Sequence, residues 1–377
     1  MSTTYVFSGP GRTEISGNHT DHQRGRVLAG AINLETVAEV VIKDNGLIRV
    51  ASQGYRPVVI ELNDLAPNRV ECNTTAALVR GIAAAFALRG AKIKGFDCVV
   101  QSNVLPGSGL SSSAAFEVLI GTILNELFYD KKLSAVEIAQ IGQYAENVYF
   151  GKPSGLMDQM ASSVGGMVYI DFENPDEPYV EKLDFDFEKA GHALCIIDSG
   201  ANHANLTDEY AAVTRELKQV SAFFGKEVLR EIPEEEFVRG IPQLRKKVPH
   251  RAILRAIHFY KENERVKKQM EALKKDDFAG FLELVKESGK SSWMYLQNIT
   301  PTGAVKHQEV ALALAMCDLF LGDRGAYRVH GGGFAGTVQA FVPLDMLDEF
   351  KANIEAVLGE GKCHVLSIRA EGGIRVK

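Results

Sequence analysis

The chain has 377 residues, of which 46% are hydrophobic and 24% are charged, and its formal net charge is −6. This length exceeds that of a usual single domain, so two domains are expected, and the negative charge argues against nucleic acid or an anionic membrane surface as a partner. The sequence contains neither a secretory h-region at its start nor an apolar stretch long enough to span a bilayer, so a cytoplasmic protein is expected.

A turn with clustered polar side chains is predicted near the N-terminus. The segment from Gly11 to His22 reads GRTEISGNHTDH. Arginine, histidine and aspartate are costly to bury together without a purpose, and such groups suit a polyhydroxy substrate, in which each hydroxyl needs donors and acceptors. Two alternatives stay open: a metal site formed by His19, Asp21 and His22, and a capped turn on the surface.

The next elements are predicted from periodicity. A helix from Thr74 to about Arg89 should begin after the capping residue Asn73 and end at Gly90. Apolar residues in a period of two predict a strand over 95–105, and helical spacing predicts a helix over 114–128. Strand, glycine-rich loop and helix in this order present free backbone N–H groups to an anion. A plain serine-capped helix is the alternative.

Two carboxylates are expected around the following turn. Ser134 should cap a helix that runs to about Tyr149 and carries Glu146, and Asp158 follows just after Gly155. Two carboxylates in different environments can divide the work, one binding Mg²⁺ and the other accepting a proton. The alternatives are a surface carboxylate for Glu146 and a helix cap for Asp158.

The second half of the chain begins with an interruption of the pattern over 188–191. An apolar strand is predicted over 193–197, so the domain boundary is placed near residue 190. The stretch 208–287 is rich in lysine, glutamate and arginine at helical spacing, which predicts solvated helices that cover a core.

Two further glycine-containing segments follow. Gly289-Lys290-Ser291 is not a Walker A loop, because position 284 is leucine where that motif needs glycine. The segment from His330 to Gly336 contains three successive glycines, which predict a tight turn that enters a strand and lies against the loop at 107–113. A flexible loop is the alternative.

Five segments, taken in order, resemble the galactokinases of the GHMP kinase superfamily, and together they extend over nearly the whole chain. The matching residues are Pro10-Gly11-Arg12 with Gly17, His19, Thr20 and Asp21; Gly107 to Ala114; Ala145-Glu146-Asn147 with Gly155 to Gln159; Asp198 to His203 with Glu209-Tyr210; and Arg328 with Gly331 to Gly336.

The resemblance implies an α+β protein with the GHMP kinase fold. An S5-like N-terminal domain would span residues 1–190 and a ferredoxin-like C-terminal domain 191–377, with the active site in the cleft between them. It also implies a galactokinase that uses ATP and Mg²⁺ to phosphorylate the anomeric hydroxyl of galactose, giving galactose 1-phosphate. The expected partners are the sugar and ATP, without nucleic acid or membrane. The oligomeric state is left open, with a monomer favoured.

The resemblance also implies roles for individual residues. Asp158 would be the catalytic base, with Arg12 beside it to favour the ionised carboxylate and to offset charge on the transferred phosphoryl group. The sugar would be bound by Asn18, His19, Asp21 and Tyr210. The ATP phosphates would be wrapped by Gly107, Ser108, Gly109, Leu110, Ser111, Ser112 and Ser113. The metal would be held by Ser113 and Glu146.

The chain departs from the galactokinase pattern at several positions. Thr13-Glu14 stands where Val-Asn is usual, Asn18 where glutamate is usual, His22 where tyrosine is usual and His330 where threonine is common. A glutamate at position 18 would accept a hydrogen bond from a C6 hydroxyl and repel a C6 carboxylate, whereas asparagine is uncharged.

The uncharged side chain of Asn18 therefore also allows a sugar with a C6 carboxylate as the substrate. Asp21-His22-Gln23 also resembles galacturonokinases, and Arg24 and Arg26 are either a nearby source of positive charge or exposed. A galacturonokinase or another galactose-like sugar 1-kinase is therefore the alternative, and galactose is preferred. A mevalonate or homoserine kinase is disfavoured by His19-Thr20-Asp21. A non-catalytic sugar and ATP sensor is disfavoured because Arg12, Asp158 and Ser113 are all present.

Overall fold

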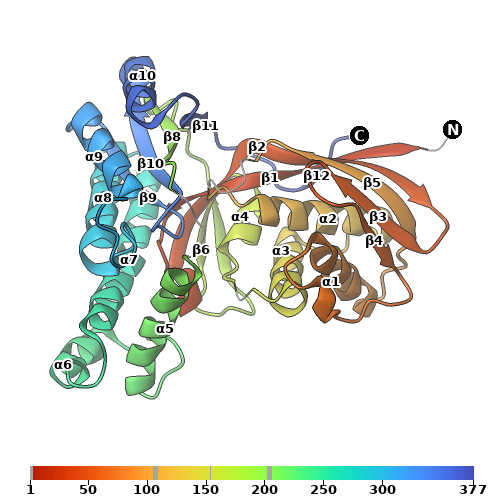
Figure 1. The fold of residues 1–377 in the computed structure, drawn as a ribbon, viewed down its shortest axis with the longest axis horizontal. Helices are drawn as coiled ribbons and strands as arrows, with labels where there is room; N and C mark the ends of the chain where they lie inside the picture. Colours follow the sequence, from red (N-terminus) through yellow and green to blue (C-terminus); the bar gives the residue numbers. More distant parts are fainter. Residues whose placement is uncertain (1–2, 105–108, 153, 202–205) are drawn as a thin grey trace.

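The computed structural model describes residues 3–104, 109–152, 154–201 and 206–377. It contains two β-sheets, each with helices packed against it (Figure 1). The first sheet is formed mainly by the N-terminal half of the chain and the second by the C-terminal half. The predicted α+β class is confirmed.

The first sheet has the strand order β12-β1-β2-β5-β3-β4, with β6 added beside β2 and β7 beside β6. All of these neighbours are antiparallel except β3 and β5, which run parallel. Its strands are β1 (Thr4–Ser16), β2 (Arg26–Lys43), β3 (Leu47–Ser52), β4 (Val58–Glu61), β5 (Gly95–Ser102), β6 (Met167–Asp171), β7 (Tyr179–Leu183) and β12 (Ile374–Arg375). The predicted strand over 95–105 is thus β5, three residues shorter.

Strand β1 is irregular where the predicted sugar signature begins. Its register against β2 shifts between Pro10 and Arg12 and again between Glu14 and Ser16. An irregularity of this kind redirects side chains that would otherwise alternate strictly between the two faces of a sheet. Arg12 and Glu14 lie between the two shifts, and the side chains of both are buried.

Helices α1–α4 cover one face of the first sheet. They are α1 (Thr75–Leu88), α2 (Ser112–Phe128), α3 (Ala135–Tyr144) and α4 (Met157–Val164). Phe7 and Val40 of the sheet pack with Phe86 of α1 and Leu119 of α2 in one apolar core, because the strands present alternate side chains to that face.

Of the two capping residues predicted for helix starts, the structure confirms one and contradicts the other. Ser134 caps α3 through a reciprocal capping box with Glu137, as predicted. The expectation that Asn73 caps α1 is wrong. The capping position belongs to Thr74, whose side chain makes no capping hydrogen bond, and Asn73 has a positive φ of 61°.

The second sheet has the order β11-β8-β10-β9 and is covered on both faces. Its strands are β8 (His192–Asp198), β9 (Ala326–His330), β10 (Thr337–Pro343) and β11 (Cys363–Leu366). Leu194 and Ile196 of β8 face α7 and α8, whereas Cys195 and Ile197 face α9 and α10. This alternation gives the second sheet two separate apolar layers.

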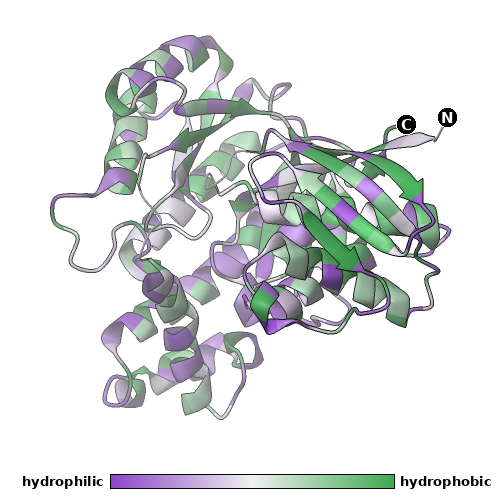
Figure 2. Ribbon diagram, turned by 45° about the vertical axis from the view of Figure 1, so that its right-hand side comes forward, coloured by the Kyte–Doolittle hydropathy of each residue, from purple (hydrophilic) through white to green (hydrophobic). Residues whose placement is uncertain are grey.

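The helices over 208–287 present charged residues to solvent and apolar residues to a core, as predicted. The helices of the second half are α5 (Thr207–Phe223), α6 (Glu234–Leu244), α7 (His250–Lys274), α8 (Phe278–Ser291), α9 (Glu309–Leu321) and α10 (Leu347–Leu358). In Figure 2 hydrophilic and hydrophobic residues alternate along these helices, while the strands of the first sheet are mostly hydrophobic. Among the described residues, no helix combines the length and apolar character needed to cross a membrane.

Several short helical segments complete the fold. The 3₁₀ turns are η1 (Asp21–Gln23), η2 (Arg69–Glu71), η4 (Leu229–Glu231) and η6 (Leu344–Met346). The π-helical turns are η3 (Ala145–Phe150) and η5 (Ser292–Leu296). Such turns often occur at functional sites, and η3 carries Glu146.

The C-terminal segment returns to the first sheet. After β11 the chain pairs Ile368 with Ile32, and β12 then pairs with β1, so both chain ends lie at this sheet (Figure 1). Arg369 fixes the return through ion pairing with Glu35 at 2.6 Å. The division into 1–190 and 191–377 stays a prediction, with the addition that the last residues of the chain belong spatially with the first sheet.

Candidate active site

Arg12 and Asp158 form the central pair of the site. Arg12 comes from the irregular part of β1, and Asp158 lies in the first turn of α4. The guanidinium Nε donates to Oδ1 of Asp158 at 2.8 Å, and Nη2 lies 2.7 Å from Oδ2, which is the two-point geometry preferred by arginine and carboxylate. The structure thus brings together the two residues predicted to be catalytic.

The loop that precedes α2 joins this pair. Ser111 donates its hydroxyl to Oδ2 of Asp158 at 2.8 Å, and Arg12 donates through Nη1 to the carbonyl of Gly109. The backbone N–H of Arg12 also donates to the carbonyl of Leu110 at 3.0 Å. The carboxylate, the guanidinium and the predicted phosphate loop therefore form one connected unit.

Two carboxylates of the site differ in their pKa. Burial alone would raise the pKa of Asp158, but the charge of Arg12 and the donated hydrogen bonds outweigh it and lower that pKa below its ordinary value. Burial, together with the negative charge of Asp158, raises the pKa of Asp21 to about 6. At neutral pH Asp158 is firmly ionised, whereas Asp21 is close to its titration range.

The predicted phosphate-binding residues lie only partly within the described structure. Gly107 and Ser108 fall outside the described residues. Gly109 and Ser111 both adopt positive φ, at 71° and 57°, and Ser112 begins α2. The N-terminus of this 17-residue helix offers unpaired N–H groups and the positive end of its dipole, both of which favour phosphate.

A cavity of about 820 Å³ opens beside this helix start. Ser112 and Ser113 line it together with Thr74 of the α1 cap, Phe116 of α2 and Phe150 of η3. Apolar and aromatic walls with a few polar groups at one end are typical of sites for small molecules such as nucleotides.

Glu146 is a buried carboxylate whose surroundings suit a cation. It lies on the π-helical turn η3 and is 4% exposed. Lys152 Nζ contacts Oε1 at 3.0 Å, while Ser154 Oγ and Gln159 Nε2 donate to Oε2 at 2.6 and 2.9 Å. A lysine ammonium on the carboxylate marks a position where positive charge is stabilised.

The donor set also fits the predicted metal. Carboxylate and hydroxyl oxygens are the hard ligands that Mg²⁺ prefers, and Mg²⁺ usually takes only one or two of them from the protein. Ser113 lies one helical turn before Glu117, whose Oε2 accepts from the same Gln159 amide as Glu146, at 2.8 Å. The helix therefore presents Ser113 and Glu117 on the same side.

The two histidines of the signature are neutral and bonded to each other. Burial lowers the pKa of His19 to about 3 and that of His22 to about 4. His19 Nε2 donates to the carbonyl of Gly332 at 3.0 Å, so its Nδ1 is the acceptor for His22 Nε2 at 3.4 Å. Among the described residues, no group of three histidine, cysteine or acidic side chains is arranged to hold a metal ion.

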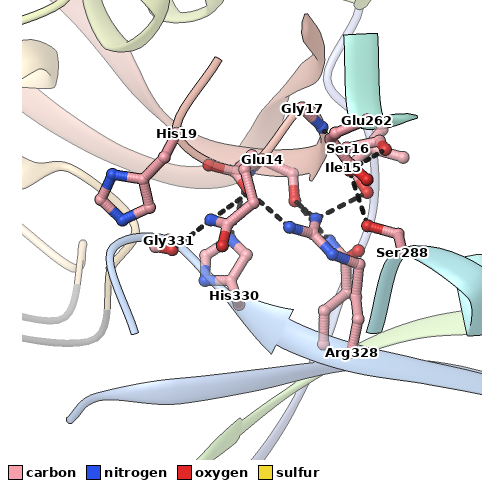
Figure 3. A network of polar contacts seen from close by, with 12 residues as sticks. Glu14, Ile15, Ser16, Gly17, His19, Glu262, Ser288, Arg328, His330 and Gly331 are labelled. Carbon is pink, nitrogen blue, oxygen red and sulfur yellow. Dashed lines mark hydrogen bonds and ion pairs between the residues drawn. The ribbon is translucent and has the colours of Figure 1, made fainter. Parts of the chain in front are cut away.

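Asn18 is fully buried, and its amide is engaged with the protein itself. Nδ2 donates to Glu14 Oε1 at 3.0 Å and to the carbonyl of Gly331 at 2.5 Å, while Oδ1 accepts from Asn298 at 2.7 Å. Glu14 in turn pairs with the fully buried Arg328 at 2.6 Å (Figure 3). The carboxylate at position 14 thus contacts the amide at position 18.

Two family models match this chain. The model of the GHMP kinases N terminal domain matches residues 77–166, and the model of the galactokinase galactose-binding signature matches residues 2–41. The chain thus combines a GHMP kinase N-terminal domain with the galactose-binding signature of galactokinases. The predicted family and the predicted enzyme class, an ATP-dependent sugar kinase, are confirmed.

Solved structures share the fold of this kinase. Lactococcus lactis galactokinase complexed with galactose has a TM-score of 0.85 at 22% identity, covering 99% of this chain and 95% of that one. Methanococcus jannaschii mevalonate kinase has a TM-score of 0.69 at 16% identity, covering 97% and 98%. Streptococcus pneumoniae phosphomevalonate kinase has 0.65 at 14%, covering 98% and 99%. These likenesses confirm the predicted GHMP kinase fold.

The arginines suggested as a source of charge for an acidic sugar are paired elsewhere in this kinase. Arg24 contacts Glu227 at 2.7 Å and Glu231 at 2.8 Å. Arg26 contacts Asp171 at 2.8 Å and Glu264 at 2.7 Å. Each guanidinium is matched by two carboxylates, so the expectation that they supply net positive charge to a uronic acid is wrong.

Three residues of the kinase site were given no role from sequence, although Gln159 belongs to one of the matching segments. Lys152 lies on the carboxylate of Glu146, Gln159 joins Glu146 to Glu117, and Asn298 joins Asn18 to the glycine turn. The departure of Asn18 from the family pattern was interpreted as altered recognition of the C6 substituent. It could not identify Asn298, which is 280 residues away in the chain.

Proposed function

We propose that this kinase transfers the γ-phosphoryl group of ATP to the anomeric hydroxyl of galactose and forms galactose 1-phosphate. The observation that carries the proposal is the unit formed by Arg12, Asp158 and Ser111, which links the galactose signature to the phosphate loop. In this proposal the acceptor hydroxyl and the donor phosphate meet at the carboxylate of Asp158. The galactose-binding signature supports the choice of sugar.

Asp158 is proposed to orient the anomeric hydroxyl and to accept its proton as the new O–P bond forms. Its lowered pKa keeps the carboxylate ionised and available as an acceptor at neutral pH. Because phosphoryl transfer passes through a loose transition state, alignment contributes more than strong basicity. Arg12 holds both oxygens of Asp158 and offsets negative charge on the transferred group.

Ser113 and Glu146 are proposed to hold Mg²⁺, which would neutralise charge on the ATP phosphates. The protein's own contribution is the placement of two oxygen ligands and the polar support of Glu146 by Ser154 and Gln159. The nucleotide is proposed to lie in the cavity of about 820 Å³, with its phosphates at the start of α2.

The sugar is proposed to lie against Asp21, His19 and Tyr210. Asp21 and Asp158 provide acceptors, while the two ring side chains provide donors. Galacturonate is the alternative substrate, but Arg24 and Arg26 are already paired with carboxylates and supply no net positive charge for it. A cytoplasmic location and a monomeric state stay predictions.

The first test is ATP consumption by the purified protein with Mg²⁺ and equal concentrations of galactose, galacturonate, N-acetylgalactosamine or glucose. We expect rapid turnover with galactose. Turnover confined to galacturonate would retain the kinase mechanism and change the substrate. Failure with all four sugars would contradict the proposal and favour a sugar and ATP sensor.

A further inference from the structure

The turn between β9 and β10 makes an unusual set of contacts. Its three successive glycines each accept a hydrogen bond through their carbonyl oxygens. Gly331 accepts from Asn18 Nδ2 at 2.5 Å, Gly332 from His19 Nε2 at 3.0 Å, and Gly333 from the Tyr210 hydroxyl at 3.0 Å. All three donors belong to residues that the galactokinase resemblance assigns to the sugar. Figure 3 shows Gly331 and His19 on the same side of this network.

A sugar is recognised through the same chemistry. Each hydroxyl oxygen accepts hydrogen bonds from donors on the protein, as a carbonyl oxygen does. Of the three donor side chains, those of His19 and Tyr210 are partly exposed, whereas that of Asn18 is completely buried. The turn therefore occupies hydrogen-bond donors that the proposed substrate needs.

We propose that residues 331–333 form a substrate-displaced lid, whose carbonyls stand in for sugar hydroxyls until galactose replaces them. This inference rests on the proposed function, because it takes His19 and Tyr210 to be sugar-binding residues. Asn18 acts here as a positioning residue that holds the lid, not as a group that reads the C6 substituent.

Asn298 is the latch of this lid. Its Nδ2 donates to Asn18 Oδ1 at 2.7 Å and to the Gly332 carbonyl at 3.2 Å, and its own carbonyl accepts from the Phe334 N–H at 2.5 Å. Any Cβ at position 333 would overlap Asn298, so glycine is required for this closed position. Asn298 thereby holds the turn at two places, through its side chain at Gly332 and through its backbone carbonyl at Phe334.

The closed position has features that oppose it. Phe334 is a bulky residue with φ of 58°, which is unfavourable for a side chain with a Cβ. Asn298 Oδ1 is buried and has no hydrogen-bond partner among the residues described, although buried polar atoms are normally paired. Because the closed turn carries these costs, modest competition from a ligand is sufficient to release it.

The test compares galactose binding by the full-length wild type and by Asn298→Ala, using calorimetry. Removing the latch should lower the galactose Kd about fivefold, as expected when the closed state loses one net hydrogen bond. Asn125→Ala is the matched control, since it also deletes a buried amide that bonds a main-chain loop, but at the far end of α2. Its Kd should stay at the wild-type value.

Hydrogen exchange of the wild-type segment 329–337 provides a second readout that does not depend on a variant. Saturating galactose should accelerate exchange in this segment, because the turn is released. Slower or unchanged exchange would overturn the lid, and so would an Asn298→Ala protein that binds galactose more weakly than the wild type or equally well. A wild type without galactose binding would overturn the proposed function itself.

Discussion

The carboxylate of Asp21 occupies the space in which a side chain at position 155 would lie. A Cβ on Gly155 would overlap Oδ2 of Asp21, so this position admits glycine alone as long as Asp21 keeps its orientation. Gly155 is therefore a structural requirement of the proposed sugar subsite, three residues before Asp158.

Gly155→Ala should consequently weaken galactose binding by about 100-fold, because misplacing a binding group by about 1 Å has effects of that order. ATP binding should remain, and both are measured by calorimetry. Gly46→Ala serves as the control, since Gly46 has a positive φ but no atoms near its Cβ position. An unchanged galactose Kd in Gly155→Ala would contradict the placement of Asp21 in the subsite.

Asp158→Asn should retain binding and lose turnover. The amide keeps the shape of the side chain but cannot accept the hydroxyl proton, so kcat should fall by about 10²–10⁴. The Kd values for ATP and galactose should change by less than about threefold. A kcat within tenfold of wild type would show that Asp158 mainly aligns the substrates.

Asp21 should make stability depend on pH. Its pKa is raised from 3.8 to about 6 by burial and by Asp158, so the folded state gains stability from protonating it. That gain is complete below pH 4 and is lost as the pH rises through 6. Asp21→Asn removes the cost of the buried charge and should be more stable than wild type at pH 8, by up to about 3 kcal/mol.

Urea unfolding of the wild type and Asp21→Asn at pH 4.5, 6 and 8 measures this difference. Asp184→Asn, which makes the same substitution at an exposed position, serves as the control. Asp21→Asn should also bind galactose poorly, which would show that a carboxylate needed for binding is kept at the expense of stability. A difference that is independent of pH would refute the assignment of the shifted pKa to Asp21.

Lys152 should compete with Mg²⁺ for Glu146. Its ammonium lies 3.0 Å from Oε1 of Glu146, so cation binding has to displace it. Lys152→Met should lower the metal concentration needed for half-maximal binding by several-fold, as measured with Mn²⁺ by electron paramagnetic resonance. Lys189→Met, which removes an exposed lysine paired with Asp186, should leave it unchanged. Weaker metal binding in Lys152→Met would mean that Lys152 supports the site.

The buried pair of Glu14 and Arg328 should be essential for stability. Arg328→Met leaves the Glu14 carboxylate buried without its cation, which typically destabilises a protein by about 3–5 kcal/mol. The exposed pair of Arg324 and Asp345 has a similar separation, 2.7 Å against 2.6 Å. Arg324→Met should have no measurable effect on urea unfolding, because solvent screens that pair. Equal effects of the two substitutions would contradict the role given to burial.

Local sequence signals located the elements of the site correctly. The strand, loop and helix around Ser113, and the capped helix that leads to Glu146, follow from periodicity and capping residues that act over a few positions. The union of Arg12 with Asp158 was expected only from the family resemblance, because 146 residues separate them.

Those local signals could not predict ion pairs between residues that are far apart in the sequence. Arg24 and Arg26 are next to the signature in sequence, yet acidic residues up to 238 positions away neutralise them. The π-helical turn at Glu146 and the shifts in β1 likewise depend on tertiary packing rather than on local propensity.

The return of the C-terminal segment to the first sheet gives the two halves of the enzyme two covalent attachments. The chain crosses between the sheets once at 184–191 and again at 367–373, and Arg369 anchors the second crossing to Glu35. Because the C-terminal half is attached to the N-terminal half at these two crossings, the line between the crossings is the axis about which it can rotate most easily. A relative motion of the two halves would therefore be a rotation about the line between these two crossings, and the galactose signature and the glycine turn would move only as parts of that rotation.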